Sequence, residues 1–183
     1  MLDQILDWDT DTLVWLNNLG IESSDNFWLY VTQIITWIPL FVFFFILMYQ
    51  NNTKKETFYK VGTIILATVC VVVTMHFCKE WVGRLRPNNN PALDGLIREL
   101  QSARGFSFFS GHASSSFAIT TMVVLFLRKK VKLIWIFYLW PLLFSFSRIY
   151  VGVHYPLDIL TGTLFGVLSA FLFYKIYWKV LGE

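Results

Sequence analysis

The sequence Ser147-Arg148-Ile149-Tyr150-Val151-Gly152-Val153-His154-Tyr155-Pro156-Leu157-Asp158 lies between two strongly apolar segments near the C-terminus. Ionisable side chains at the edge of a membrane are costly and mark functional sites by default, so Arg148, His154 and Asp158 stand out. Asp158 can fix the tautomer of His154 and leave the other ring nitrogen free to attack. Pro156 suits the first turn of a helix, where the charge of Asp158 is also favoured. A helix-capping Asp beside an interfacial His explains the same pattern, so both interpretations stay open for this stretch alone.

The composition is typical of a protein that lies in a lipid bilayer. Of the 183 residues, 56% are hydrophobic and only 15% are charged, whereas a soluble domain has roughly 25% charged residues. The length fits one compact bundle, and we expect a single membrane-embedded domain over residues 1–183. Cys70 and Cys78 share one apolar segment, at about 12 Å along a helix, which is too far for a disulfide. The sequence shows no Cys/His cluster of the metal-binding type and predicts neither a metal site nor a cofactor.

The apolar segments predict an all-α integral membrane bundle, because only helices satisfy their own backbone hydrogen bonds in lipid. We expect five transmembrane spans, near residues 27–49, 61–78, 106–127, 133–150 and 159–178. Before them, residues 2–19 carry leucines on one face and acids on another, which is typical of an amphipathic helix on the membrane surface. The acids are Asp3, Asp7 and Asp11. A helix packed against the rest of the protein is the alternative. Acids at this position also argue against a cleaved targeting peptide.

The basic residues are unevenly distributed between the connections. Nine of the fifteen lie in the loop between the first two spans, the loop between the third and fourth spans, and the C-terminal tail. These connections share one side of the membrane, which is cytoplasmic by the positive-inside rule. We therefore expect a multi-pass protein of the inner (plasma) membrane, with residues 79–105 and 147–158 facing the periplasm or outside.

Two further motifs lie on the predicted outer side. Lys79 and Arg86 are two helical turns apart and project from one face of a helix, which Pro87 then ends. Two aligned cations suit a phosphate, although cations that snorkel to lipid headgroups give the same pattern. The sequence Ser110-Gly111-His112 opens the third span, where a helix N-terminus offers backbone N–H groups to an anion. Close packing of small residues against neighbouring helices is the alternative here.

Taken together, Lys79…Arg86-Pro87, Ser110-Gly111-His112 and Ser147-Arg148…His154…Asp158 resemble the three signatures of the type 2 phosphatidic acid phosphatase superfamily in order and spacing. The resemblance covers residues 79 to 158 and departs from the family pattern at Phe109, where the second signature usually begins with Pro. The vanadium-dependent haloperoxidases share the signatures but are soluble. A small anion transporter is the non-enzyme alternative, and it would place its charges in mid-span rather than at span ends.

The resemblance implies a metal-independent phosphatase that acts on a membrane lipid phosphate or diphosphate through a phosphohistidine. It implies that His154 is the nucleophile, that Asp158 orients it, and that His112 protonates the leaving oxygen and then activates water. It also implies a set of groups that hold the phosphoryl oxygens: Lys79, Arg86, Arg148, and the backbone at Ser110 and Gly111. By resemblance to bacterial members of similar size, we rank undecaprenyl diphosphate or a phosphatidate-type lipid first as substrate, followed by phosphatidylglycerophosphate and lipid A. No nucleic-acid partner is expected, and the oligomeric state stays open.

The connection over residues 88–104 is long enough to form a lid or a loop that selects the lipid headgroup. Several charged residues lie in or near it, and we interpret them as solvated loop charges, with contact to a lipid headgroup as the alternative: Glu80, Arg84, Arg98 and Arg104.

Overall fold

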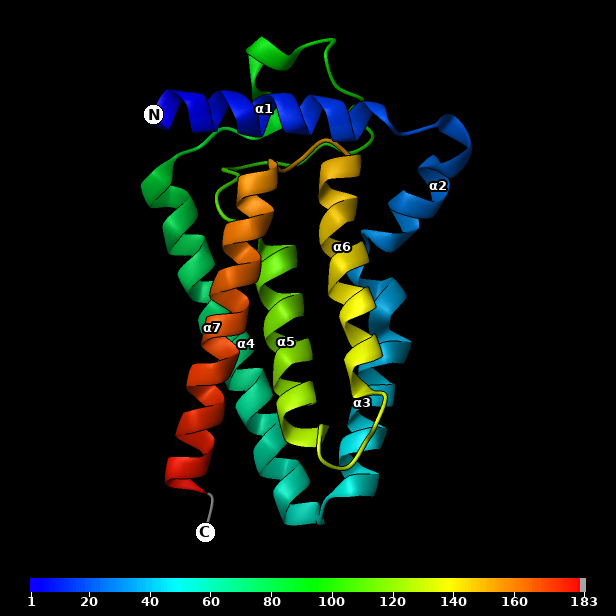
Figure 1. The fold of residues 1–183 in the computed structure, drawn as a ribbon, viewed down its shortest axis with the longest axis vertical. Coiled ribbons are helices and arrows are strands. Elements are labelled where there is room, and N and C mark those ends of the chain that lie inside the picture. The colour runs from blue at the N-terminus through cyan, green and yellow to red at the C-terminus, as the bar shows by residue number, and fades with distance from the viewer. Residues whose placement is uncertain (182–183) are drawn as a thin grey trace.

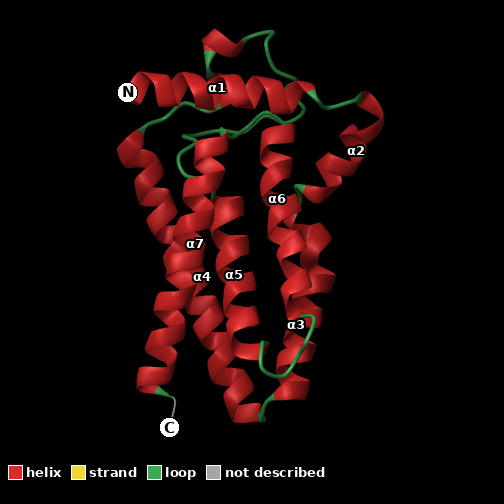
Figure 2. Cartoon of the chain, viewed as in Figure 1, coloured by secondary structure: helices red, strands yellow, loops and turns green. Residues whose placement is uncertain are grey.

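The computed structural model describes residues 1–181, and the regular structure in that range is helical. Its seven α-helices are α1 (Leu2–Asn18), α2 (Glu22–Val31), α3 (Ile38–Asn51), α4 (Lys54–Val82), α5 (Gly111–Leu127), α6 (Leu139–Tyr150) and α7 (Pro156–Val180). Short 3₁₀ turns accompany them: η1 (Ile34–Trp37), η2 (Pro87–Asn89), η3 (Pro91–Leu93) and η4 (Ile134–Tyr138). Helices α3 to α7 run side by side along the long axis, α1 lies across one end, and α2 connects the two parts (Figures 1 and 2). The predicted all-α bundle is confirmed.

Three helical segments are long and apolar enough to cross a membrane: Ile34–Asn51, Lys54–Leu93 and Pro156–Val180. Gly111–Leu127 and Ile134–Tyr150 are shorter apolar helices. Helix α5 is buried along most of its length, whereas α3, α4 and α7 leave many large apolar side chains exposed. The apolar outer surface suits lipid chains, because in a bilayer exposed leucine loses nothing by facing outward.

The predicted continuous span over residues 27–49 is wrong, because α2 ends at Val31 and α3 begins at Ile38. Pro39 lies in the first turn of α3, a position that its missing N–H and fixed φ favour as a helix start. The indole N–H of Trp37 donates to the Val31 carbonyl at 2.8 Å and closes the corner.

The other predicted spans overlap observed helices with shifted ends. Helix α4 extends well beyond residues 61–78 in both directions, and α7 begins at Pro156, three residues before the predicted 159. Helix α5 begins only at Gly111, five residues after the predicted 106, and residues 101–110 form bends and irregular chain. The fourth predicted span, residues 133–150, combines η4 with α6.

Helices α5 and α7 approach each other closely because α7 has small residues on the facing side. A Cβ atom added to Gly162 would lie 2.6 Å from the Ser110 carbonyl oxygen, closer than real Cβ atoms approach. A Cβ atom added to Gly166 would likewise lie too close to the Ser114 carbonyl oxygen. Small residues permit such close approach between helices in membranes. As a result, the Ser110 N–H donates to the Asp158 carbonyl at 3.0 Å, which joins the start of α5 to the first turn of α7.

Helix α1 packs one face on the end of the bundle. Asp9, Leu13 and Asn17 follow one another at intervals of one helical turn, and all three are fully buried. The Asn17 amide donates to three carbonyl oxygens, those of Arg98, Ile149 and Tyr150, at 2.9–3.2 Å. The alternative of a helix packed against the protein therefore holds for this face.

The face of α1 that points away from the bundle is exposed. The predicted acidic face, Asp3, Asp7 and Asp11, is exposed, and so are Ile5 and Leu19 of the predicted apolar face, at 42% and 60%. Apolar side chains left open on a helix at the end of the bundle suit the boundary between headgroups and acyl chains.

Candidate active site

His154 lies in the short segment between α6 and α7, and its side chain is buried. Its Nδ1 is 3.1 Å from Asp158 Oδ2, and its Nε2 is 3.1 Å from Arg86 Nη1. Since a guanidinium can only donate, Nε2 is the acceptor and the ring proton belongs on Nδ1, directed at Asp158. Burial, together with the surrounding cations, lowers the pKa of His154 well below its ordinary value. The ring is therefore neutral at pH 7, with its lone pair on Nε2.

Asp158 sits in the first turn of α7 and is fully buried. Its Oδ2 accepts both from His154 and from the Tyr155 N–H, the latter at 3.0 Å. The capping role and the orienting role that the sequence leaves open are thus performed by one carboxylate. Pro156 precedes it at the first position of the helix, as the sequence predicts.

Lys79 and Arg86 both point toward His154 from the end of α4. The Lys79 ammonium, in the last turn of the helix, donates to the carbonyl oxygens of Phe106 and Ser107 at 2.9 and 2.8 Å. Arg86, just beyond the helix, donates to His154 and to the carbonyl oxygens of Arg104 and Val153. Both cations are among the charges that depress the pKa of His154, so both lie within electrostatic reach of it.

Arg148 approaches the same place from the last turn of α6. Its Nη1 donates to Thr32 Oγ1 at 2.5 Å and to Gln101 Oε1 at 2.9 Å. Its Nε is buried and has no hydrogen-bond partner among residues 1–181. A buried N–H without an acceptor is costly, so this group is available to donate a hydrogen bond to a bound anion.

Ser110 is the N-cap of α5, where its Oγ accepts from the Ala113 N–H at 3.4 Å. Its own N–H is already donated to the Asp158 carbonyl. This geometry leaves the Gly111 N–H as the backbone donor at the start of α5 and does not support the anion contact predicted for the Ser110 N–H. Phe109, which replaces the usual proline, is buried, with its ring centroid 4.9 Å from that of Phe165.

His112 occupies the second position of α5 and is half-buried. Its Nε2 is 3.2 Å from the Thr32 carbonyl oxygen, and its ring lies 4.5 Å from that of Phe144. The structure therefore brings the predicted pair of histidines to one end of the bundle, but it gives them different hydrogen-bond partners.

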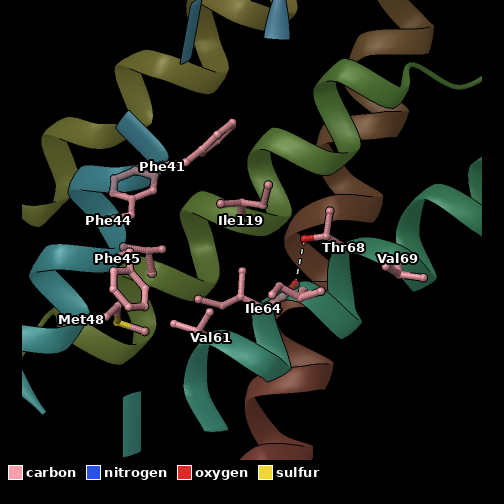
Figure 3. A pocket seen from close by; sticks show the side chains of 11 residues that line it. Phe41, Phe44, Phe45, Met48, Val61, Ile64, Thr68, Val69 and Ile119 are labelled. Atoms are coloured by element: carbon pink, nitrogen blue, oxygen red, sulfur yellow. Dashed lines mark hydrogen bonds between the residues drawn. The ribbon is translucent and has the colours of Figure 1, made fainter. Parts of the chain in front are cut away.

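Two adjoining apolar cavities lie within the bundle, and His112 lines the first of them. The first has a volume of about 400 Å³ and is lined by His112 and side chains of η1, α3, α4, α5 and α6. The second, of about 280 Å³, lies between α3, α4 and α5, whose side chains point toward one another around it (Figure 3). Phe41, Thr68 and Ile119 line both, so the cavities adjoin. Together they fall within the range of roughly 300–1,000 Å³ that is typical of ligand pockets.

Two charged residues near the site have roles that the sequence did not reveal. The prediction that Arg84 is a solvated loop charge is wrong, because its side chain is 18% exposed and donates to both Asp9 and Asp158. The same prediction is wrong for Arg98, which pairs with Asp25 at 2.6 Å. A signal for Asp9 existed, since it shares a helix face with Leu13 and Asn17, where an isolated acid is unexpected. Glu80 and Arg104, by contrast, are exposed, as expected for solvated charges.

Known proteins resemble this chain over most of its length. A family model described as the PAP2 superfamily matches residues 56–181. A lipid A 4'-phosphatase of Bacteroides thetaiotaomicron is 32% identical, over 98% of this chain and 81% of that protein. An undecaprenyl-diphosphatase of Sulfolobus acidocaldarius is 33% identical, over 76% of this chain and 63% of that protein.

The fold has a solved counterpart as well. The crystal structure of a transmembrane PAP2-type phosphatidylglycerolphosphate phosphatase from Bacillus subtilis superimposes with a TM-score of 0.77, covering 97% of this chain and 88% of that one. At 21% identity this likeness concerns the fold. The bundle, the ordered signatures around His154 and the family match over more than half of the chain agree, and the chain belongs to the PAP2 superfamily of membrane lipid phosphatases.

Proposed function

We propose that this phosphatase releases phosphate from a lipid of the lipid A 4'-phosphate class, through a phosphohistidine at His154. The observation that carries the chemistry is the line Asp158–His154–Arg86, in which a buried carboxylate holds the ring proton and leaves Nε2 aimed at a cation. A neutral imidazole with a fixed tautomer, beside cations that attract phosphate, is the arrangement that nucleophilic attack on phosphorus needs.

The reaction has two steps. In the first, Nε2 of His154 forms a bond to phosphorus as the bond from phosphorus to the lipid oxygen breaks, and His112 gives its proton to that oxygen. In the second, His112 removes a proton from water, the water oxygen attacks phosphorus, and the bond to Nε2 breaks. The products are the lipid alcohol and inorganic phosphate, and both histidines return to their starting states.

Phosphoryl transfer depends mainly on positioning and on compensation of the charge on the equatorial oxygens. Lys79, Arg86 and Arg148 would supply that compensation, and the unpaired Nε–H of Arg148 offers a ready donor. Arg86 would leave Nε2 of His154 for a phosphoryl oxygen when substrate binds, which frees the nucleophile only in the loaded site. The three cations would make a catalytic metal unnecessary.

The substrate is proposed from the extent of similarity and from the cavities. The lipid A 4'-phosphatase aligns with 98% of this chain, whereas the undecaprenyl-diphosphatase aligns with 76%. This favours lipid A over undecaprenyl diphosphate, the substrate class that the sequence ranks first. The adjoining apolar cavities beside His112 would hold a hydrocarbon chain of either lipid, so undecaprenyl diphosphate remains the second candidate.

A panel of phosphate donors tests the proposal. We expect the purified protein to release phosphate from lipid A 4'-phosphate with a kcat/KM at least about tenfold above that for undecaprenyl diphosphate, which corresponds to about 1.4 kcal/mol of differential transition-state binding. Activity should persist in EDTA, and a water-soluble phosphomonoester without a hydrocarbon chain should be a poor substrate. A preference for undecaprenyl diphosphate would select the second candidate, and loss of activity in EDTA that Mg²⁺ restores would contradict the mechanism.

We further propose that five spans cross the membrane, with α1 on the outer surface and the site facing the periplasm or outside. The support is the unequal distribution of basic residues between the two ends of the bundle. In a background without Cys70 and Cys78, we expect Asn89→Cys to react with an impermeant thiol reagent in intact cells. Lys130→Cys, at the opposite end, should react only after lysis. The reverse pattern would show that the site faces the cytoplasm.

A further inference from the structure

Two further charged residues, Arg84 and Asp9, form a hydrogen-bonded chain that ends on Asp158, the partner of His154. Asp158 uses Oδ2 for His154, while its Oδ1 accepts from Arg84 Nη1 at 3.0 Å. The other nitrogen of the Arg84 fork donates to Asp9 Oδ2 at 2.6 Å. Both carboxylates are fully buried. One guanidinium thus joins the catalytic carboxylate to an acid of α1.

Asp9 also binds the backbone directly before Asp158. Its Oδ1 accepts from the Leu157 N–H at 2.8 Å, in the first turn of α7. The Arg84 guanidinium lies 3.7 Å from the centre of the Tyr155 ring, whose hydroxyl is held by Asn90 at 3.1 Å. The position of the Asp158 carboxylate is therefore fixed from two directions, by Arg84 at its oxygen and by Asp9 at its backbone.

We infer that Arg84 and Asp9 are positioning residues for phosphoryl transfer, which fix the Asp158 carboxylate and set the net negative charge behind His154. This inference rests on the proposed role of His154 as nucleophile. With Arg84 alone as partner, Asp158 would form a pair with no net charge. Such a pair would stabilise a positively charged or phosphorylated imidazole less than a negatively charged group does. Asp9 shares the guanidinium, so the three groups together keep one net negative charge.

A charge balance of this kind predicts that substitutions of Asp9 and of Arg84 shift the pKa of His154 in opposite directions. Asp9→Asn keeps an oxygen for the Leu157 N–H but removes the charge that balances Arg84, so His154 should become less basic. Arg84→Gln leaves two carboxylates without a cation, so His154 should become more basic. The double variant restores one net negative charge and should return the titration of His154 toward that of the native protein. The other charged or titratable groups that face His154 are unchanged in these variants: Lys79, Arg86, Arg148 and His112.

The test combines kinetics with NMR of the full-length protein in detergent. Because the chain has only three histidines, selective ¹⁵N-histidine labelling gives a spectrum in which His154 can be assigned with His76→Gln and His112→Gln. We expect Arg84→Gln to raise the pKa of His154 and Asp9→Asn to reverse that rise in the double variant. For Asp9→Asn we expect kcat to fall roughly tenfold with KM changed less than about twofold, since only transition-state stabilisation is lost.

A thermodynamic cycle then separates positioning from general damage to the fold. If both residues act through Asp158, then in an Asp158→Asn background each should change kcat by less than about twofold, because groups that act as a unit are strongly non-additive. Asp11→Asn, an exposed acid on the same helix, is the matched control and should retain native kinetics. If Asp9→Asn fails to fold, Arg84→Lys carries the test, since it keeps the charge and should leave the His154 titration closer to native than Arg84→Gln does.

Three outcomes would overturn the inference. They are equal losses in the native and Asp158→Asn backgrounds, a His154 titration that the double variant does not restore, and native kcat in both single variants. Each of these leaves the proposed function intact as long as His154→Ala is inactive. Hydrolysis by His154→Ala would instead refute the proposed function itself, so the two failures are distinguishable.

Discussion

Replacing His154 by alanine is expected to abolish phosphate release and to prevent formation of any covalent phosphoenzyme. The substitution removes a ring whose Nδ1 is hydrogen-bonded to Asp158 and whose Nε2 faces Arg86. The loss of kcat should be on the order of 10⁴-fold or more, the scale seen when a nucleophile is deleted from a catalytic unit. Rapid quench with ³²P-labelled substrate, followed by gel analysis under alkaline conditions, measures the phosphoenzyme directly.

His76→Ala is the matched control for this experiment, because His76 is an exposed histidine on α4. It should form the phosphoenzyme at the native rate. Label found on the His154→Ala protein would mean that another residue attacks phosphorus. Asp158→Asn should still form the adduct, but slowly, since the ring keeps its attacking nitrogen and loses the carboxylate that fixes its tautomer.

Replacing His112 by alanine should produce the second-largest effect, with a different signature. Both steps lose their proton-transfer group, which is worth roughly 10²- to 10⁴-fold in rate. With a diphosphate substrate, the leaving group departs without much help, so the second step suffers more than the first. The variant should therefore accumulate a phosphohistidine that is labile in acid and stable in base.

The native enzyme should show a bell-shaped dependence of kcat/KM on pH, because attack needs His154 neutral and leaving-group departure needs His112 protonated. Burial and the neighbouring cations lower the pKa of His154, so protonation of His154 limits the rate only well below pH 6.5, its ordinary value. A His112→Ala protein that turns over without accumulating phosphoenzyme would contradict the assignment of His112 to the second step.

Much of the site was accessible from the sequence because its parts are local. The interval of three residues between His154 and Asp158 fits one turn of chain that begins a helix, and Pro156 marks that start. The four polar side chains predicted from spacing, Lys79, Arg86, His154 and Asp158, do face one another in the structure. The helical bundle itself follows from apolar segments that can satisfy their backbone only as helices.

The contacts that escaped prediction join residues far apart in sequence. Arg84 and Asp9 are 75 residues apart, and no periodic pattern links a loop arginine to an acid of a terminal helix. Thr32 and Gln101, which bind Arg148, are themselves uncharged, so nothing in the sequence distinguishes them from their neighbours. The break at residues 32–37 was also hidden, since no charged residue interrupts the segment there and only Pro39 marks the new start.

The position of α1 has a consequence for the order in which the protein is made. Asp9 is synthesised well before the backbone that it binds, because Leu157 lies 148 residues later in the chain. Asn17 likewise binds carbonyl groups 132 and 133 residues downstream. Nascent chains grow by roughly 5–20 residues per second, so α1 must wait several seconds or more for these partners. A chain released before the start of α7 would therefore lack the Asp158 carboxylate that binds His154 and the Leu157 N–H that Asp9 accepts from.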